Sequence, residues 1–538
     1  MEHLDIILML MALLVGLYSL AEQISISYPI LLVLAGLGIS LIPGLPVVQL
    51  TPEVAFLLFL PPLLFDAARN TSWHDFKKNR NSIGRLAIGL VLLTTAGVAI
   101  CAYYLIPGFT WPLAFVLGAI ISPTDSVAAT SAFKNLHLPK RMVAILEGES
   151  LVNDASALIT YRYAVAAVLS GAFILWHAAL QFVLVALGGI MVGMAIGYAF
   201  IWIQKRFLNN PTVETVITLL LPFASYLLAE HMHVSGVLSV VVTGLMISWR
   251  AHEIFSFQTR MQMNSFWETL IFLLNGFVFI LIGLQLPAII HHPSDHTLAE
   301  MIGYGLLISA VVILIRMVWV FSTAHIANWL ERLRGRNERT PINDKKLLVI
   351  GWSGMRGVVS LATALALPLV MENGQEFPQR NVILFITFIV ILITLVFQGL
   401  TLPLLIRFLR VSEPEGKTML EERRLRLALC NSARNFINES LAPHVPEQAL
   451  VEVRNRLERQ ISYFNGVLKT EHHNENASLQ HELFYDYLHS EQAIIDHQRK
   501  LLIDMHKKGS FSAVVLRRIE QYLDSRSLTL SAMIKAFK

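Results

Sequence analysis

The sequence predicts an all-α polytopic membrane protein, with about thirteen transmembrane helices in residues 1–410 and a helical cytoplasmic tail in residues 411–538. Three observations lead to this fold class. First, 55% of the 538 residues are apolar and only 15% are charged, whereas soluble domains carry about 25% charged residues. Second, 35 of the 80 charged residues lie in residues 411–538, so the first region is strongly apolar. Third, the lysine and arginine residues of residues 1–410 are concentrated in every second loop between the apolar runs.

The apolar runs define the candidate membrane spans, each of which needs about 20 residues. They begin near Ile6, Tyr28, Val54, Leu86, Leu113, Met142, Ala179, Val213, Val234, Trp267, Met301, Leu347 and Asn381. The first, eighth and ninth runs are short, so twelve crossings are an alternative. The N-terminus is acidic, whereas a cleaved signal peptide begins with basic residues, so the first run is expected to be retained.

Loop charge predicts the orientation. The loops that follow odd-numbered spans contain clusters of lysine and arginine, in residues 69–85, 134–141, 205–206, 250–260 and 326–346. The loops that follow even-numbered spans together contain a single lysine or arginine, Arg380. Since basic loops stay in the cytoplasm, we expect the N-terminus outside and the tail inside. A soluble helical core would not sort its charges in this way.

Function is expected where ionisable residues lie inside the apolar spans, because each costs about 2.5–3.5 kcal/mol on insertion scales. These residues are Asp66, Asp125, Glu147, Glu149, Asp154, Arg162, Arg316 and Arg356. They must pair, face water or be protonated.

Span 6 concentrates these groups. Helical spacing places Glu147, Ser150 and Asp154 on one face, and Glu149 and Asn153 on the adjacent face. A buried carboxylate can bind H⁺ or Na⁺ but hardly both at once. That competition is the minimum chemistry of an exchanger.

Spans 5 and 12 are expected to be broken helices. Pro123 removes a backbone donor beside Thr124 and Asp125, and three glycines interrupt Gly351–Gly357. Irregular backbone at membrane depth is tolerated only where it lines a cavity or is buried in protein. If spans 1–6 and 8–13 are inverted halves, the two breaks occupy corresponding positions, which indicates a transport site at the membrane midplane.

Two arginines need partners inside the membrane. Arg356 lies in the glycine-rich segment and is expected to form a structural ion pair with Glu149. Arg316 also needs a carboxylate, which the sequence does not identify. Asp66 follows two prolines at the end of span 3.

Three motifs resemble those of the monovalent cation:proton antiporters of the sodium/proton-exchanger type, and the resemblance covers residues 1–410. Glu147–Ala155 is similar to the family's G-E-S-L-x-N-D-A signature, Leu60–Ala67 to its L-P-P-(apolar)₃-acidic motif, and Gly354–Gly357 to its G-x-R-G motif. Span 5 departs from the family, which reads Thr-Asp-Pro, because here the proline precedes the Thr-Asp pair. The shift changes which backbone carbonyls are freed.

The resemblance implies a secondary active transporter, not an enzyme, which exchanges Na⁺ or Li⁺ for H⁺ in a bacterial plasma membrane and serves pH and sodium homeostasis. Asp154 would carry Na⁺ and H⁺ alternately, with Ser150 and the Thr124 carbonyl as Na⁺ ligands. Asn153 is typical of electroneutral exchange. The remaining implied positions are Asp125 and Asp66 as nearby acids, the Glu149–Arg356 pair, and Glu147, Arg316 and Pro123 in support. A homodimer with crossed broken helices and a regulatory role for the tail in residues 411–538 are also implied, with no cofactor besides the transported ions.

Alternative functions remain. K⁺/H⁺ antiport is the nearest. A cation channel needs a continuous wet pore, and a single buried aspartate site argues against it. An intramembrane protease needs a His-Glu-x-x-His motif or a Ser-His pair, and the spans contain neither. A net charge of +4 with no clustered basic face argues against nucleic-acid binding.

Overall fold

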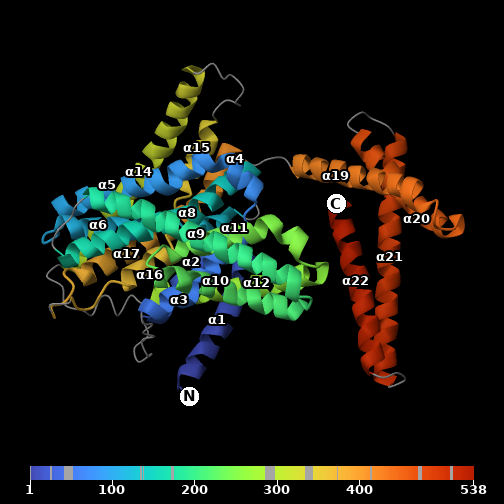
Figure 1. Ribbon diagram of the computed structural model, residues 1–538, viewed down its shortest axis with the longest axis horizontal. Helices are drawn as coiled ribbons and strands as arrows, with labels where there is room; N and C mark the ends of the chain where they lie inside the picture. The colour runs from blue at the N-terminus through green and yellow to red at the C-terminus, as the bar shows by residue number, and fades with distance from the viewer. Residues whose placement is uncertain are drawn as a thin grey trace. The chain divides into compact units, whose positions relative to one another are not determined.

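The chain is described from a computed structural model, which is almost entirely helical over the residues that it describes. These are residues 2–24, 27–40, 52–133, 136, 138–170, 175–284, 297–333, 343–371, 374–411, 415–469, 475–508 and 513–537. The chain divides into two compact units, Met1–Ser412 and Glu413–Lys538, here called the membrane unit and the tail unit (Figure 1).

The first half of the membrane unit runs to the end of α8. Its elements are α1 (Glu2–Ile24), α2 (Tyr28–Ser40), α3 (Pro52–Asn70), α4 (Trp73–Gly84), the π-helix η1 (Arg85–Leu90), α5 (Val91–Leu105), α6 (Trp111–Ile121), α7 (Ser126–Phe133) and α8 (Lys140–Ser170). Here α4, η1 and α5 form one continuous helical stretch, whereas α6 and α7 are separated by four non-helical residues.

The second half of the membrane unit begins with α9. Its elements are α9 (Leu175–Phe207), α10 (Pro211–His231), α11 (Gly236–Ile254), α12 (Phe257–Leu284), α14 (Leu298–Leu333), α15 (Asp344–Trp352), α16 (Val358–Leu365), α17 (Arg380–Ile393), the π-helix η2 (Thr394–Gln398) and α18 (Gly399–Leu409). Every apolar run named above contains described helix. Within the described residues, eight helical stretches are long and apolar enough to cross a membrane. The total number of crossings remains a prediction.

The surface of the membrane unit suits a hydrocarbon environment. Large apolar side chains are exposed along α9 and α14, among them Met191 at 62%, Leu314 at 62% and Val318 at 63%. Rows of this kind are unfavourable in water, but they match lipid chains. The all-helical membrane fold is therefore confirmed.

Close helix contacts hold α12 in place. Gly36 of α2 and Gly283 of α12 each lie against backbone atoms of the other helix, so that a Cβ added at either position would overlap them. Gly276 of α12 packs equally closely on Leu14 of α1. Small residues allow this approach between membrane helices, and the contacts fix the rotation of α12.

Spans 5 and 12 are discontinuous, as the sequence predicts. The chain leaves helical geometry between Ile121 and Ser126, and again between Trp352 and Val358. The two non-helical segments meet, because the backbone N–H of Asp125 donates to the carbonyl of Met355 at 2.8 Å. Each break therefore satisfies part of the other's backbone, and the prediction that the broken helices cross is confirmed.

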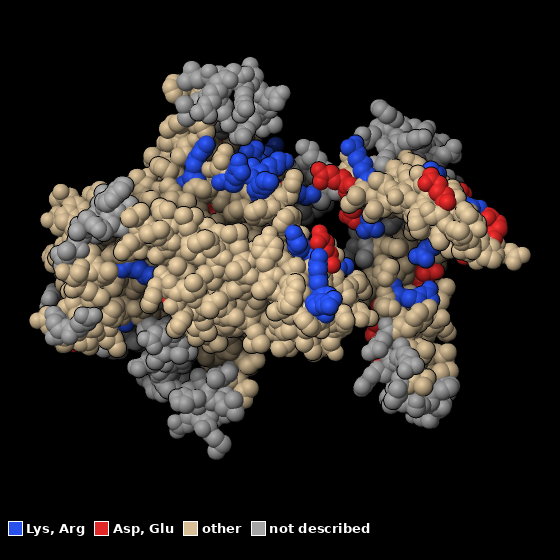
Figure 2. All heavy atoms as spheres, in the orientation of Figure 1, with Lys and Arg blue, Asp and Glu red and all other residues tan. Residues whose placement is uncertain are grey.

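Basic side chains gather at one end of the membrane unit. Figure 2 shows Lys and Arg clustered over α4 and α15, where Lys77, Lys78, Arg80 and Lys345 are exposed. These residues belong to two segments that the sequence predicts to be cytoplasmic, 69–85 and 326–346.

The tail unit is a separate helical body. Its elements are α19 (Glu415–Phe436), the π-helix η3 (Ile437–Leu441), α20 (Glu447–Lys469), α21 (Glu475–Lys508) and α22 (Ala513–Phe537). The long helices α21 and α22 run side by side as a hairpin (Figure 1). Its core is formed by Tyr463, Phe464, Leu488, Ile495 and Leu530. A regulatory role for this unit remains a prediction.

Candidate functional site

A cavity of about 60 Å³ lies where the two breaks meet α3, α8 and α12. Its polar lining residues include Thr124, Asp125, Ser126, Ser150, Asp154, Asn275 and Ser360. On α3 the lining runs from Leu60 to Ala67, that is, toward the end of α3 that precedes the basic helix α4. The cavity therefore contains residues of the predicted midplane site and extends along α3 toward the end of the bundle where α4 lies.

Asp154 is the unsatisfied acid of this cavity. Its side chain is 6% exposed and lines the cavity, yet no described residue donates a hydrogen bond to its carboxylate. A buried charge without a donor is costly. These oxygens are consequently available to a proton, a cation or water in the cavity.

Asp125 differs from Asp154 because backbone donors hold its carboxylate. Its Oδ1 accepts from the N–H groups of Val127 at 2.8 Å and Ala128 at 3.4 Å, so it caps the N-terminus of α7. Gly357, directly before α16, lies so close to this carboxylate that any Cβ would overlap it. The positive ends of α7 and α16 thus both face Asp125, an arrangement that favours its charged form.

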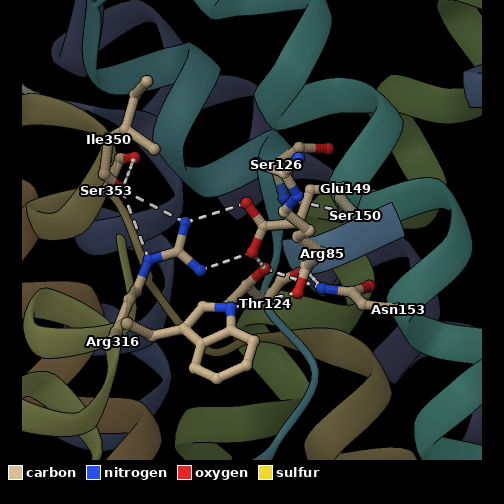
Figure 3. Close-up of polar contacts among 10 residues, drawn as sticks. Arg85, Thr124, Ser126, Glu149, Ser150, Asn153, Arg316, Ile350 and Ser353 are labelled. Atoms are coloured by element: carbon tan, nitrogen blue, oxygen red, sulfur yellow. Dashed lines mark hydrogen bonds and ion pairs between the residues drawn. The ribbon is translucent and has the colours of Figure 1, made fainter. Parts of the chain in front are cut away.

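Glu149 forms a two-pronged ion pair with Arg316 (Figure 3). Arg316 Nη1 donates to Glu149 Oε1, and Nη2 donates to Oε2 at 2.9 Å. Arg316 Nε and Nη2 also donate to the Ile350 carbonyl in α15, at 3.3 and 3.1 Å. Both charged side chains are 1% exposed. The pair links α8, α14 and α15.

The prediction that Glu149 pairs with Arg356 is therefore wrong. Arg316 occupies both carboxylate oxygens of Glu149, and none of the three guanidinium nitrogens of Arg356 has a hydrogen-bond partner among the described residues. The backbone fixes Arg356 instead, because its N–H donates at 3.1 Å to Thr394 Oγ1 in the π-helix η2. π-helical turns are frequent at functional sites.

Polar bonds tie the first break to α8 (Figure 3). Asn153 Nδ2 donates to Thr124 Oγ1 at 2.7 Å and to the Thr124 carbonyl at 3.3 Å. Thr124 Oγ1 donates to Glu149 Oε1 at 3.2 Å, and the Ser126 N–H donates to Ser150 Oγ at 3.1 Å. The Thr124 carbonyl, predicted as a Na⁺ ligand, thus already accepts one hydrogen bond. Pro123 lines the cavity within the same break.

Six predicted residues lie outside the cavity lining. Four of them, Asn153, Glu149, Arg316 and Arg356, make the contacts described above, and the other two are Asp66 and Glu147. The Asp66 carboxylate accepts from Arg69 Nη2 at 2.8 Å and Asn70 Nδ2 at 3.0 Å, on its own helix. Glu147 is half-buried and does not line the cavity, although it shares a predicted face with Asp154. Their separation of seven positions corresponds to about 10 Å along a helix, so Glu147 lies well away from Asp154 along α8.

Two cavity residues were missed from the sequence. Asn275 is 3% exposed and comes from α12, and Ser360 is 1% exposed and comes from α16. Both interrupt apolar runs, which was the available signal. An amide or a hydroxyl is less conspicuous in such a run than a charge, because it costs less to insert.

Arg162, which had no predicted partner, connects α8 to α10. Its Nη2 donates to Glu230 Oε1 at 2.6 Å, and the two side chains are 47% and 27% exposed. The same carboxylate oxygen accepts from the Gly236 N–H at 3.4 Å. Arg162 follows Asp154 by eight residues along α8, away from the end marked by α4.

Comparison with known proteins gives consistent results. A family model for the sodium/hydrogen exchanger transmembrane region matches residues 9–408. An uncharacterised Na⁺/H⁺ exchanger of Mycobacterium tuberculosis (strain ATCC 25618 / H37Rv) is 33% identical over 518 residues, 95% of this chain and 93% of the relative. The Na⁺/H⁺ antiporter NhaP of Pseudomonas aeruginosa is 33% identical over 377 residues, 68% of this chain and 83% of the relative.

Two further proteins extend the comparison. A sodium, potassium, lithium and rubidium/H⁺ antiporter of Bacillus subtilis (strain 168) is 36% identical over 366 residues, 66% of this chain and 54% of the relative. The structure of the sodium proton antiporter MjNhaP1 from Methanocaldococcus jannaschii at pH 8 superposes with a TM-score of 0.58, at 21% identity, over 77% of this chain and 99% of that chain. The structural likeness bears on the fold alone.

Proposed function

Because this chain belongs to the sodium/hydrogen exchanger family, we propose that it is a secondary active antiporter that exchanges Na⁺ or Li⁺ for H⁺ at Asp154. The observation that carries the proposal is the carboxylate of Asp154, which lines a cavity and accepts no hydrogen bond from any described residue. H⁺ and a monovalent cation compete for the same oxygens.

Ser150 and Thr124 are the proposed oxygen ligands beside Asp154. Ser150 Oγ already accepts from the Ser126 N–H, which leaves one lone pair for a cation. The Thr124 carbonyl also keeps one lone pair after its bond to Asn153. Hard monovalent cations favour such oxygen ligands. Asp125 lies between the ends of α7 and α16 and adds negative potential in its ionised form.

The buried charges support exchange of one cation for one proton. Three carboxylates (Asp125, Glu149 and Asp154) and two guanidinium groups (Arg316 and Arg356) lie at the crossing, which leaves one negative charge. Binding one H⁺ or one Na⁺ neutralises it, whereas moving the empty site through the bilayer would carry a net charge, which is costly. Only the two loaded forms then cross, so the cycle is electroneutral.

K⁺ is the second candidate cation. The Bacillus subtilis relative is named for sodium, potassium, lithium and rubidium, so a site of this family accommodates larger ions. We further propose residence in a bacterial plasma membrane as a homodimer, with the N-terminus outside and the tail in the cytoplasm, and a role in pH and sodium homeostasis.

The test uses purified protein in liposomes that carry an inward-acid pH gradient and a pH-sensitive dye. Na⁺, Li⁺ or K⁺ is added in turn, with and without a valinomycin clamp of the membrane potential for the Na⁺ and Li⁺ series. We expect Na⁺ and Li⁺ to dissipate the gradient at a rate that the clamp leaves unchanged.

Three other outcomes would each change the conclusion. A response to K⁺ alone would mean that the transported cation is K⁺ and not Na⁺ or Li⁺. A rate that follows the clamp would contradict the charge balance at the crossing. Cation flux without proton movement would overturn antiport and favour a channel.

A further inference from the structure

Asn275 places an amide on the cavity wall opposite the charged residues. It comes from α12, whereas the acids come from α8 and from the broken segment before α7. Its neighbours in sequence, Leu273, Leu274, Gly276 and Phe277, are apolar or lack a side chain. A buried amide in such a run costs about 1–3 kcal/mol if it has no partner, so its position needs an explanation.

Packing fixes the direction of Asn275. Gly276, the next residue, lies directly on Leu14 of α1, with no room for a Cβ. Gly283 of α12 is equally close to the backbone of α2. These contacts prevent α12 from rotating, and Asn275, which is 3% exposed, is held facing the cavity that Asp154 and Ser150 also line.

One hydrogen bond accounts for part of the amide. The Tyr28 hydroxyl on α2 lies close enough to the Asn275 side chain to share a hydrogen bond with it. Tyr28 packs in turn edge-on against Tyr18 at 5.6 Å between ring centroids. A side-chain amide offers two donors and an acceptor oxygen with two lone pairs, so one bond to Tyr28 leaves capacity directed at the cavity.

We propose that Asn275 is a specificity-determining ligand, whose amide oxygen completes the oxygen shell of the cation held by Asp154 and Ser150. This rests on the proposed exchange at Asp154. A neutral oxygen favours a metal cation over a proton, because a proton needs only one carboxylate, whereas Na⁺ needs several oxygens. Asn275 thereby sets cation affinity and the preference among Na⁺, Li⁺ and K⁺ without altering the charge of the site.

The test compares Asn275→Leu, which keeps the size of the side chain and removes both polar groups, with the native protein in the liposome assay. We expect the Na⁺ concentration for half-maximal exchange to rise on the order of tenfold, since one oxygen ligand is lost. The dependence on H⁺ should change little. Asn275→Gln, which moves the oxygen by one methylene, should alter the ratio of Na⁺, Li⁺ and K⁺ rates.

Two controls separate a ligand from a structural role. Thr259→Val changes a fully buried polar residue of the same helix, which bonds to Ser256 and lies outside the cavity, and should leave cation affinity unchanged. Tyr28→Phe removes the bond to Asn275 but keeps its amide. If Tyr28→Phe raises the Na⁺ concentration for half-maximal exchange as much as Asn275→Leu does, Asn275 has only a structural role.

The outcomes also separate this inference from the proposed function. An inactive native protein would overturn the exchange itself. Active native protein, with native affinity and cation ratios in both Asn275→Leu and Asn275→Gln, would overturn the role of Asn275 alone. If Asn275→Leu does not fold, the ratios measured with Asn275→Gln decide.

Discussion

Asp154→Asn is expected to reduce cation-coupled proton movement to the rate of protein-free liposomes. Asparagine has the same size as aspartate, but it binds no proton near neutral pH and provides no charge for Na⁺. The substitution also leaves the site at the crossing permanently neutral. Binding and release of H⁺ or Na⁺ then no longer determine whether the site can move across the bilayer. The measurement is the gradient-dissipation assay with Na⁺, Li⁺ and K⁺.

The fold should survive this change. The Asp154 carboxylate accepts no hydrogen bond from the described residues, and removing a buried charge without a donor is not destabilising. The melting temperature in detergent should therefore equal or exceed the native value. Asp75→Asn, on the exposed surface of α4, is the matched control and should exchange at the native rate. Native rates in Asp154→Asn would disprove the site.

Arg316→Met is expected to lower the free energy of unfolding by about 3–5 kcal/mol, the range for breaking a buried ion pair by removing one partner. Glu149 would lose both guanidinium donors, and the Ile350 carbonyl would lose its bonds to Arg316 and keep the one from Ser353 Oγ. Thermal denaturation of the purified protein in detergent gives the difference. Arg407→Met, at the exposed end of α18, should change stability by no more than about 0.5 kcal/mol.

The double variant Glu149→Leu/Arg316→Met tests whether the loss comes from the unpaired carboxylate. Replacing both partners by apolar groups is often nearly neutral, so it should recover most of the lost stability. If Arg316→Met melts like Arg407→Met, then Arg356 has taken over Glu149. In that case Arg316→Met/Arg356→Met should show the full loss.

The positions of the breaks and of the acids were predictable because each violates a rule of membrane helices. Pro123 and the glycines of 351–357 cannot continue a regular helix, and charges such as Asp154 are costly at membrane depth. Such features stand out in a single sequence without knowledge of neighbours. The crossing of the two broken helices was expected only from the resemblance to the family, because matching positions along the chain do not by themselves bring two breaks into contact.

The partners of these groups were less predictable, because pairing depends on which helices meet. The sequence favoured Arg356 as the partner of Glu149 and identified none for Arg316. Only the packing of α14 against α15 places Arg316 at both carboxylate oxygens. The bond from Arg69 to Asp66, by contrast, spans a single helical turn, so the spacing of the two residues in the sequence could have indicated it. Asn275 depends on helix rotation, which glycine contacts set.

The ion pair between Arg162 and Glu230 is expected to make transport sensitive to salts whose ions are not transported. Any transport step that moves α8 relative to α10 must break this pair, and its side chains are exposed enough, at 47% and 27%, to be screened by dissolved ions. The screening length falls from about 8 Å at 0.15 M to about 3 Å at 1 M.

At fixed Na⁺, added choline chloride should therefore speed exchange by the native protein and leave the rate of Arg162→Gln unchanged. An equal response in both would mean that the pair stays closed throughout the cycle. If only the native protein responds, ionic strength acts as an osmotic-stress signal that is sensed at Arg162, eight residues from Asp154 along α8.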